Sequence, residues 1–415
     1  MRIFKFGGAS VKDAESIKNM LRVLKHEGYE NTLIVISAMG KMTNAIEKIT
    51  DSYFYKKDDL QENIEFVRNY HLKIINELFE EKNHPIYVEV ESLLGQLSGF
   101  LIKNKSTDYN FIYDQIVGYG ELLSTKIVNA FLNENNIETN WIDVRDYIKT
   151  DANFRDASVN WELTSKNIST LNSKIVYLTQ GFLGSNSNGK TTTLGREGSD
   201  YTAAIFAYCL NAESLTIWKD VEGVLNADPR FFTTTQLLKQ ISYNEAIEMA
   251  FYGASVIHPK TLKPLENKNI PLYVRSFYTI ENKGTKVGKG HDLVPEMPCF
   301  ILKQNQILVS ISALDFSFMV ENNLSELFKI LHNYKLKVNL IQNSALSFSV
   351  CIEDKFNNFK QFLIDLELKY QISYVENVSL YTIRHANKIA VSEIEQKGKV
   401  LLKQATKGTV QVVMQ

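Results

Sequence analysis

The chain has 415 residues, of which 44% are hydrophobic and 22% charged, values typical of a globular protein and unlike those of a disordered or collagenous one. Its 46 Lys and Arg residues against 47 Asp and Glu residues leave a formal charge of -1, so no net positive field favours nucleic acid or an anionic membrane surface. The three cysteines, Cys209, Cys299 and Cys351, lie far apart, which argues against a disulfide framework or a zinc knuckle and favours buried thiols in a reducing cytosol.

The first two thirds of the chain alternate short β-rich runs with longer helical ones, which predicts a parallel sheet covered by helices. The chain begins directly with such a run, without the apolar core of a signal peptide, and nowhere has about 18 uncharged apolar residues in succession, so we expect a cytoplasmic protein. Strands are predicted at 2–6, 32–36, 140–144, 174–180, 215–218 and 272–275. Apolar residues at helical spacing predict a helix over 14–24, and a longer helical region is predicted over 58–135.

The character of the sequence changes at 284–298, where glycines and prolines cluster in an otherwise polar segment. We therefore place a domain boundary there, with one domain at 1–295 and a second at 299–415. Beyond the boundary, strands are predicted at 307–312, 337–341, 347–352 and 373–378, and helices at 324–334 and 356–370. The resulting order is βαββαβ, a ferredoxin-like unit over about 307–378. A strand at 379–384, a helix at 391–404 and a strand at 409–414 form what we interpret as an abbreviated second unit.

The residues after the first predicted strand begin the motif KFGGAS, which places two glycines and a serine between a strand and a helix. Glycines let backbone N–H groups approach a phosphate closely, and the start of the next helix adds unpaired donors. Lys5, at the end of the strand, would reach the same phosphates. An ordinary tight turn with a solvated lysine explains this segment equally well on its own.

Two further segments place polar side chains at strand or helix ends. Ser37 and Thr43 follow the second predicted strand, at the carboxyl edge where open α/β sheets bind ligands. Thr43 is also a candidate helix N-cap, and that role does not exclude ligand contact. Glu121 follows two glycines just before a predicted helix, where an acid often serves only to complement the helix dipole.

The segment 181–202 is the richest in glycine, hydroxyl and charged residues, and its GSNSNGKT stretch matches a P-loop. A P-loop needs a helix that begins at its Lys-Thr pair, whereas the TTTLGREG that follows here is poor helix material, so we reject that interpretation. With a helix that starts near Ser199, Arg196 offers a planar fork for a carboxylate or phosphate. Asp200 would orient a substrate amine or a magnesium-bound water. The structural alternatives are an N-cap at Ser199 and an ion pair of Arg196 with Glu197 or Asp200.

Two later loops also carry charge. The segment WKDVEGVLNADPR follows a predicted strand and ends in a turn that fixes two charged groups beside a proline. His258 precedes a proline and has no Cys or second His at ligand spacing, so we do not expect it to bind a metal.

Taken in order, KFGGAS, SAMGKMTN, GYGELLS, TQGFLGS, GKTTTLGREGSDYTA, WKDVEGVLNADPR and EAIEMAFYGASVIHPKTL resemble the motifs of aspartate kinases in the amino-acid kinase family, across residues 1 to about 290. The tail is similar to the ACT regulatory region of that family. The resemblance implies an α/β fold with an open, mostly parallel, carbamate-kinase-like sheet sandwiched by helices, followed by an α+β ferredoxin-like ACT region. It also implies phosphorylation of the L-aspartate side chain by ATP with Mg²⁺, giving 4-phospho-L-aspartate, the first step towards lysine, threonine and methionine.

The resemblance also implies roles for individual residues. By position it assigns catalysis to Lys5 and Asp200. It assigns contacts with the amino-acid substrate to Ser37, Thr43, Glu121, Arg196 and Ser199. It assigns contacts with ATP to Lys5, Gly7, Gly8, Ala9, Lys219, Asp220, Leu225, Arg230 and Lys260. No residue is assigned as a direct metal ligand, because Mg²⁺ is expected to arrive with ATP.

Elementary chemistry agrees with this set of residues. An aspartate carboxylate has a pKa of about 3.9, so at neutral pH it is already ionised and needs no general base to become a nucleophile. It needs charge neutralisation, because an anionic nucleophile must approach ATP. A site of lysine, arginine, glycine and acids, without a catalytic histidine or cysteine, suits that requirement.

The sequence departs from the family pattern at several positions. Ala9 replaces a threonine, and Glu197 stands where many relatives have glycine, which costs about 1 kcal/mol if its φ is positive. Asn339 and Ala345 stand where lysine-inhibited relatives have acids. Two alternatives therefore stay equally open, feedback by lysine or threonine and a truncated or reshaped effector site.

Because ACT units pair edge to edge, we expect a homodimer. Two other functions remain open at this stage: a superfamily member acting on glutamate, N-acetylglutamate, carbamate or a nucleotide, and a non-catalytic amino-acid sensor.

Overall fold

The structure, a computed structural model, describes residues 1–254, 257–290, 292–315 and 317–415. The chain forms two compact units. The first comprises Met1–Val224, Leu237–Ile247 and Val256–Val294, and the second comprises Leu225–Gln236, Glu248–Ser255 and Pro295–Gln415. Two short segments that precede residue 295 therefore belong to the second unit.

An eight-stranded sheet forms the centre of the first unit, in the order β3-β4-β2-β1-β7-β9-β10-β8. Its strands are β1 (Arg2–Phe6), β2 (Thr32–Ile36), β3 (Asn140–Ile142), β4 (Tyr177–Gln180), β7 (Ser214–Lys219), β8 (Gln240–Ser242), β9 (Leu272–Ser276) and β10 (Thr285–Gly288). Every adjacent pair is parallel except β9 and β10. All five residues of β2 are buried, as expected for a parallel strand covered on both faces. The expected open, mostly parallel sheet is confirmed.

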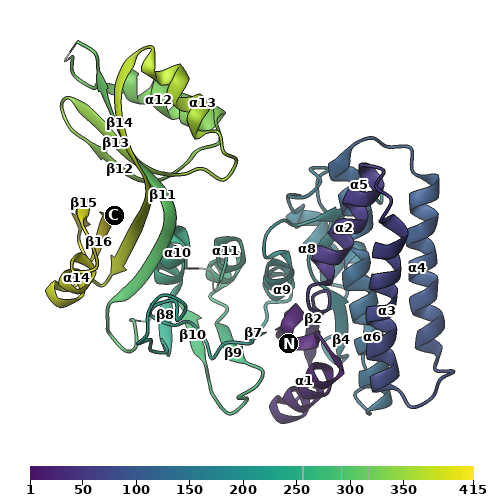
Figure 1. The fold of residues 1–415 in the computed structure, drawn as a ribbon. Coiled ribbons are helices and arrows are strands. Elements are labelled where there is room, and N and C mark those ends of the chain that lie inside the picture. Colours follow the sequence, from purple (N-terminus) through teal and green to yellow (C-terminus); the bar gives the residue numbers. More distant parts are fainter. Residues whose placement is uncertain (255–256, 291, 316) are drawn as a thin grey trace. The chain divides into compact units, whose positions relative to one another are not determined.

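Helices cover both faces of this sheet (Figure 1). The helices that precede β9 are the 3₁₀ helix η1 (Gly8–Val11) and the α-helices α1 (Ala14–Glu27), α2 (Met42–Phe54), α3 (Leu60–Leu78), α4 (Pro85–Lys103), α5 (Tyr109–Val117), α6 (Tyr119–Glu134), α7 (Val144–Tyr147), α8 (Trp161–Ile168), α9 (Gly198–Cys209), α10 (Tyr243–Tyr252) and α11 (Pro259–Lys268). Helix α10 begins in the first unit and ends in the second. Helices α3, α4 and α6 lie side by side. They share one apolar core with α1 and with β1 and β2. The predicted helical region over 58–135 is confirmed as the four helices α3 to α6.

A small antiparallel hairpin that the sequence patterns did not predict lies between β4 and α9. Its strands are β5 (Leu183–Ser185) and β6 (Thr191–Thr193), so residues 184–191 form strand and turn and no helix begins at Lys190. The rejection of the P-loop is therefore correct. Helix α9 begins at Gly198, which confirms a helix start near Ser199.

The second unit contains a six-stranded antiparallel sheet in the order β12-β13-β11-β14-β16-β15. Its strands are β11 (Cys299–Ala313), β12 (Lys337–Asn343), β13 (Ser347–Glu353), β14 (Tyr370–Arg384), β15 (Val400–Thr406) and β16 (Thr409–Met414), and its helices are α12 (Glu321–Asn333), α13 (Phe359–Glu367) and α14 (Lys388–Glu395). The order from β11 to β14 is the predicted βαββαβ. Helices α12 and α13 pack their apolar sides on β11 and β13 (Figure 1).

The two longest strands of this sheet correct the sequence-based boundaries. The strands predicted at 373–378 and 379–384 form one strand, β14, and β11 begins eight residues before the predicted 307. Asn305 and Asn377 take positive φ values of 55° and 58°, near the point where the pairing of β11 and β14 shifts register. An irregularity of this kind bends a strand without ending it, and that is why one long strand resembled two short ones.

The helix predicted at 391–404 is wrong in its second half. Helix α14 ends at Glu395, and Val400–Thr406 form β15, which pairs with β16. Gly398 lies between them, and a Cβ there would come within 2.6 Å of the Gln415 carbonyl oxygen, so the end of the chain passes too close for a helix with side chains to continue. Pairing with a distant strand decides the structure of this segment.

In the described part of the chain, no helix is long and apolar enough to cross a membrane. The three cysteine thiols form no disulfide.

Candidate active site

A cavity of about 330 Å³ opens at the carboxyl edge of β1, β2 and β7 in the first unit. It is lined by Lys5, Ser37, Thr43, Glu121, Phe182, Gly195, Glu197, Gly198, Ser199, Asp200 and Lys219. This is the edge at which open α/β sheets bind ligands. Seven residues to which the sequence analysis assigned catalytic or binding roles, on five separate segments, therefore meet in one place.

The floor of the cavity holds a buried cluster of three charges. Lys5 Nζ lies 2.6 Å from Asp200 Oδ1, and Lys219 Nζ lies 3.5 Å from Asp200 Oδ2. Burial raises the pKa of Asp200, but the ammonium groups of Lys5 and Lys219 outweigh burial and hold this pKa below its usual range. Two cations against one carboxylate leave the cluster with a positive charge.

Strand register explains how these charges meet. Lys5 on β1 pairs with Ile217 on the neighbouring parallel strand β7, so Lys219, two residues further on, points to the same face of the sheet. Asp200 lies in the first turn of α9, which packs on β1 and β7. Near that helix start, a Cβ at Gly181 would lie 2.4 Å from the Ser199 Cβ, so glycine at 181 lets α9 begin directly above the sheet.

Glu121 is a buried carboxyl group with an unused oxygen. Its side chain accepts one hydrogen bond, through Oε1 from the Ala38 N–H at 3.3 Å, and its Oε2 has no partner among the described residues. Burial raises the pKa of Glu121 to about 8, and the hydrogen bond from Ala38 only partly offsets this. At neutral pH Glu121 is therefore mostly protonated, and a cation placed beside Oε2 would favour ionisation.

The turns after β1 and β2 interlock beside the cavity. Gly40 donates its N–H to the Gly8 carbonyl oxygen at 2.9 Å. A Cβ at Gly8 would lie 2.7 Å from the Gly40 carbonyl oxygen and 2.9 Å from that of Ala38. Gly8 is thus required by this backbone approach alone, and contact of Gly7, Gly8 and Ala9 with phosphate stays a prediction.

Both cap interpretations from the sequence are wrong. Helix α2 begins at Met42 with Lys41 as N-cap, which leaves the Thr43 hydroxyl one residue inside the helix, where it lines the cavity. Helix α9 has Glu197 as N-cap in place of Ser199, and Glu197 makes no side-chain cap hydrogen bond. No ion pair joins Arg196 to Glu197 or Asp200 in the described part of the chain.

Glu197 has an unfavourable backbone conformation and an unsatisfied oxygen. Its φ of 54° lies in the left-handed region, and its buried Oε2 has no partner among the described residues. Glu197 stands where many relatives have glycine, and its φ is positive, which is the condition under which the sequence analysis expected an energetic cost.

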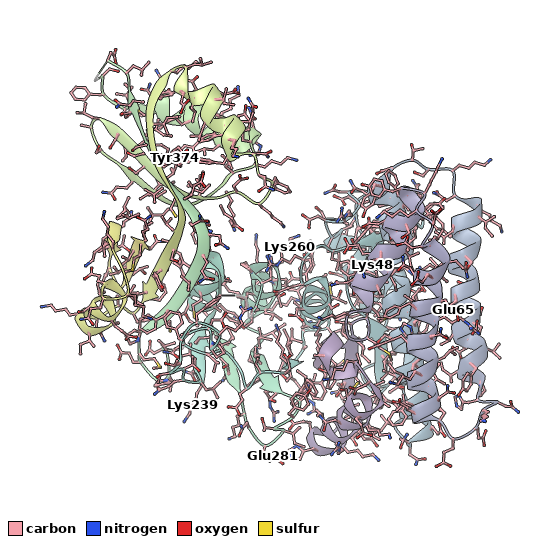
Figure 2. The ribbon with its side chains drawn as sticks, in the orientation of Figure 1. Lys48, Glu65, Lys239, Lys260, Glu281 and Tyr374 are labelled. Atoms are coloured by element: carbon pink, nitrogen blue, oxygen red, sulfur yellow. The ribbon has the colours of Figure 1, made fainter. Side chains whose placement is uncertain are left out.

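Other predicted residues lie outside the cavity lining. Arg196 is exposed on the loop between Gly195 and Glu197, and Asp220 is exposed after β7. Lys260, at the start of α11 beside α9 (Figure 2), forms an ion pair with Asp156.

Leu225 and Arg230 belong to the second unit, where Arg230 pairs with Asp228 at 2.6 Å. The roles predicted for these residues stay predictions. Phe182, which lines the cavity with a φ of 71°, gave no signal in the sequence.

The described residues contain no group of three or more His, Cys, Asp or Glu side chains placed to hold a metal ion. His258 acts as the N-cap of α11, because its Nδ1 accepts the Lys260 N–H at 3.2 Å.

Comparison with known proteins adds independent findings. Residues 1–276 match the amino acid kinase family. The lysine-sensitive aspartokinase 3 of Escherichia coli is 31% identical over 355 residues, which cover 85% of this chain and 78% of that protein. Two solved structures of E. coli aspartokinase III, one with lysine and aspartate (T-state) and one with aspartate and ADP (R-state), have TM-scores of 0.82 and 0.81. Each is 27% identical and covers 100% of this chain and 96% of the solved one.

The backbone of Glu197 yields a first prediction. We expect Glu197→Gly to raise the free energy of unfolding by about 1 kcal/mol, because glycine adopts a positive φ without the steric cost that glutamate bears. Glu197→Ala is the matched control, since it removes the same carboxylate but keeps a Cβ. Urea denaturation of both variants would measure the change, and an equal gain in both would show that the side chain, not the backbone, is the cause.

The pKa of Glu121 yields a second prediction. The folded chain keeps Glu121 protonated up to about pH 8, whereas the unfolded chain ionises it above about pH 4.5. Glu121 therefore lowers the free energy of unfolding by an amount that is zero at low pH and grows as the pH rises from about 4.5 to about 8. We expect Glu121→Gln to gain stability over the wild type by more than about 1 kcal/mol between pH 5 and pH 8. Exposed Glu62→Gln on α3 controls for net charge. A difference that does not change with pH would contradict this account.

Proposed function

The chain belongs to the amino acid kinase family, as one of its aspartokinases, and we propose that it transfers the γ-phosphoryl group of ATP to the side-chain carboxylate of L-aspartate, forming 4-phospho-L-aspartate. The observation that carries this proposal is the buried Lys5–Asp200–Lys219 cluster in the same cavity as Glu121. The cluster offers positive charge to phosphate, and Glu121 offers a carboxylate to an amine.

The cluster supplies what phosphoryl transfer to a carboxylate needs. Both the acceptor carboxylate and ATP are anionic, so their approach requires cations in a site shielded from water. Lys5 and Lys219 supply two, and Asp200 holds both ammonium groups in place. The cavity lining contains no histidine or cysteine, which suits an acceptor that is already ionised and needs no general base.

Glu121 and the loop at 195–197 would bind the amino-acid end of the substrate. The free Oε2 of Glu121 suits an ammonium group, and a substrate ammonium there would stabilise the ionised form of Glu121. Arg196 would bind the α-carboxylate with its guanidinium fork, and Ser37, Thr43 and Ser199 add hydroxyls to the lining. An acid whose amine is acylated would leave Glu121 neutral and unpaired.

We propose ATP as the phosphoryl donor, because a solved structure of E. coli aspartokinase III contains ADP, and we propose that Mg²⁺ enters with ATP. Mg²⁺ is commonly held mainly by phosphate oxygens, so the proposal needs few ligands from the chain. Bound there, Mg²⁺ would neutralise part of the phosphate charge. The chain's own contribution is the pair of lysines and the backbone turn at Gly7 and Gly8.

Regulation by lysine or threonine at the ACT region, assembly as a homodimer and a cytoplasmic location are also parts of this proposal. Asn339, which stands where lysine-inhibited relatives have an acid, accepts a hydrogen bond from Lys303 at 2.8 Å and donates one to Gln306 at 2.7 Å. The Asn339 side-chain oxygen thus already accepts a hydrogen bond from an ammonium group of this chain, that of Lys303. This supports a reshaped effector site.

The substrate is tested by ATP-dependent hydroxamate formation with hydroxylamine as a trap, using L-aspartate, L-glutamate and N-acetyl-L-glutamate in parallel. We expect a signal with L-aspartate alone. A signal only with another acid would retain the kinase fold and replace the substrate, and no signal from folded protein would favour a nucleotide acceptor or a non-catalytic sensor.

The role of Lys5 gives a further prediction. We expect Lys5→Ala to lower kcat by at least about 100-fold and to raise KM for aspartate much less, because the Lys5 charge acts chiefly on the transferring phosphoryl group. Lys18→Ala on α1, which removes a surface lysine that pairs with Glu15, is the control. An unchanged kcat in folded Lys5→Ala protein would remove Lys5 from the catalytic step.

A further inference from the structure

Helix α5 holds the outer edge of the β5–β6 hairpin with side chains in place of a strand. Among the described strands, β6 pairs with β5 alone, along one edge. On its other edge, Gln115 from α5 donates Nε2–H to the Thr191 carbonyl oxygen at 2.8 Å and accepts the Thr191 N–H at 3.2 Å. Gln115 thus secures the first residue of β6, and its neighbour Asp114 secures the last.

Asp114 is fully buried and accepts three hydrogen bonds. Its Oδ2 accepts the Thr193 N–H at 2.9 Å, and its Oδ1 accepts the Thr193 hydroxyl at 2.8 Å. Oδ2 also accepts the Arg155 N–H at 3.0 Å. One carboxylate therefore joins the end of β6 to a second segment, the loop at 151–158.

The 151–158 loop forms a hydrogen bond with the end of β6 and further hydrogen bonds within itself. Ala157 donates its N–H to the Thr193 carbonyl oxygen at 2.9 Å, and Asp151 Oδ1 accepts the N–H groups of Asn153 and Ser158 at 3.1 and 3.0 Å. The Arg155 guanidinium lies 4.4 Å from the centre of the Tyr113 ring on α5. The loop therefore approaches α5 at the point where Asp114 accepts the N–H of Arg155 from the loop backbone.

The 151–158 loop in turn packs against the loop that lines the cavity. Gly195 lies two residues after Thr193, and a Cβ at Gly195 would come within 2.5 Å of Asp156 Oδ1 and 3.4 Å of the Arg155 carbonyl oxygen. Asp156 is also ion-paired with Lys260 of α11. The 195–197 loop is thus held from its start by β6 and from outside by 151–158, and Asp114 bonds to both.

Asp114 suits this task electrostatically. Burial raises the pKa of Asp114 to about 6, against the opposing effect of the hydrogen bonds from Arg155 and Thr193, so the group is ionised above that pH. The charged or titratable groups that face it are the Arg155 guanidinium from the loop and the Tyr113 hydroxyl from its own helix. An asparagine would fit the same partners, because its Oδ1 can accept both N–H groups while its Nδ2 donates to the Thr193 hydroxyl.

We propose that Asp114 is a positioning residue for aspartate binding, which fixes the 195–197 loop, and with it Arg196 and Glu197, through Thr193 and the 151–158 loop. Asp114 does not line the cavity and acts only through these neighbours. This inference rests on the proposed function, since it takes aspartate as the ligand of the loop.

The test compares Asp114→Ala, Asp114→Asn and Gln115→Ala. We expect Asp114→Ala to raise KM for aspartate about tenfold, with kcat and KM for ATP within about twofold, because the loop meets the amino-acid end of the substrate. Asp114→Asn should stay within about threefold of the wild-type KM. Gln115→Ala, which loses two hydrogen bonds from the same helix to the same strand but at its far end, should leave KM for aspartate unchanged.

Hydrogen exchange of the ligand-free variants provides a readout that does not depend on the substrate. Asp114→Ala should speed exchange of the amides at 193–198, and Gln115→Ala should not. If Asp114→Ala does not fold, Thr193→Val, which removes one of the three hydrogen bonds, should raise KM for aspartate about threefold.

Equal effects of Asp114→Ala and Gln115→Ala on KM and exchange, or an unchanged KM in folded Asp114→Ala, would overturn the proposal. A wild-type protein that does not phosphorylate aspartate would refute the proposed function instead, and the exchange comparison would then decide whether Asp114 orders the loop.

Discussion

The buried ion cluster of Lys5, Asp200 and Lys219 is the interaction on which the rest of the site depends. Removing charges from water is costly, and one carboxylate between two ammonium groups compensates for that cost only in part. The remaining positive charge makes the cavity suitable for anions. The fold provides the cluster by placing β1 beside β7 in parallel and by starting α9 above both strands. The proposed binding of phosphate and of the acceptor would thus share one electrostatic origin.

The parts of the fold that depend on local patterns were predictable from the sequence. β1 and β2 match their predicted bounds, because each is a short apolar run that ends at glycine or a polar turn. The cavity residues were also predictable in part, because parallel strands bring their carboxyl ends to one edge. Lys5 and Ser37 follow from this rule, whereas Glu121 and Asp200 stood out through their place beside glycines at helix starts and through resemblance to a family.

The parts that depend on distant contacts were not predictable. β15 resembles a helix in its local sequence, and only pairing with β16 makes it a strand. The β5–β6 hairpin lies in a glycine-rich segment without a strand pattern, and its outer edge forms hydrogen bonds with side chains of α5, which lies far away in the sequence. Asp114 gave no local signal for the same reason, since its partners are 41 and 79 residues away. The conformation of Glu197 likewise became visible only in three dimensions.

In the proposed binding mode, one cavity holds the amino acid with its ammonium group at Glu121 and its side-chain carboxylate towards Lys5. The most direct measurement is a crystal structure of the chain with L-aspartate and ADP. We expect the substrate ammonium within hydrogen-bonding distance of Glu121 Oε2, the α-carboxylate at Arg196 and the side-chain carboxylate facing Lys5. Aspartate bound outside this cavity, or bound with its α-carboxylate facing Lys5, would contradict this binding mode.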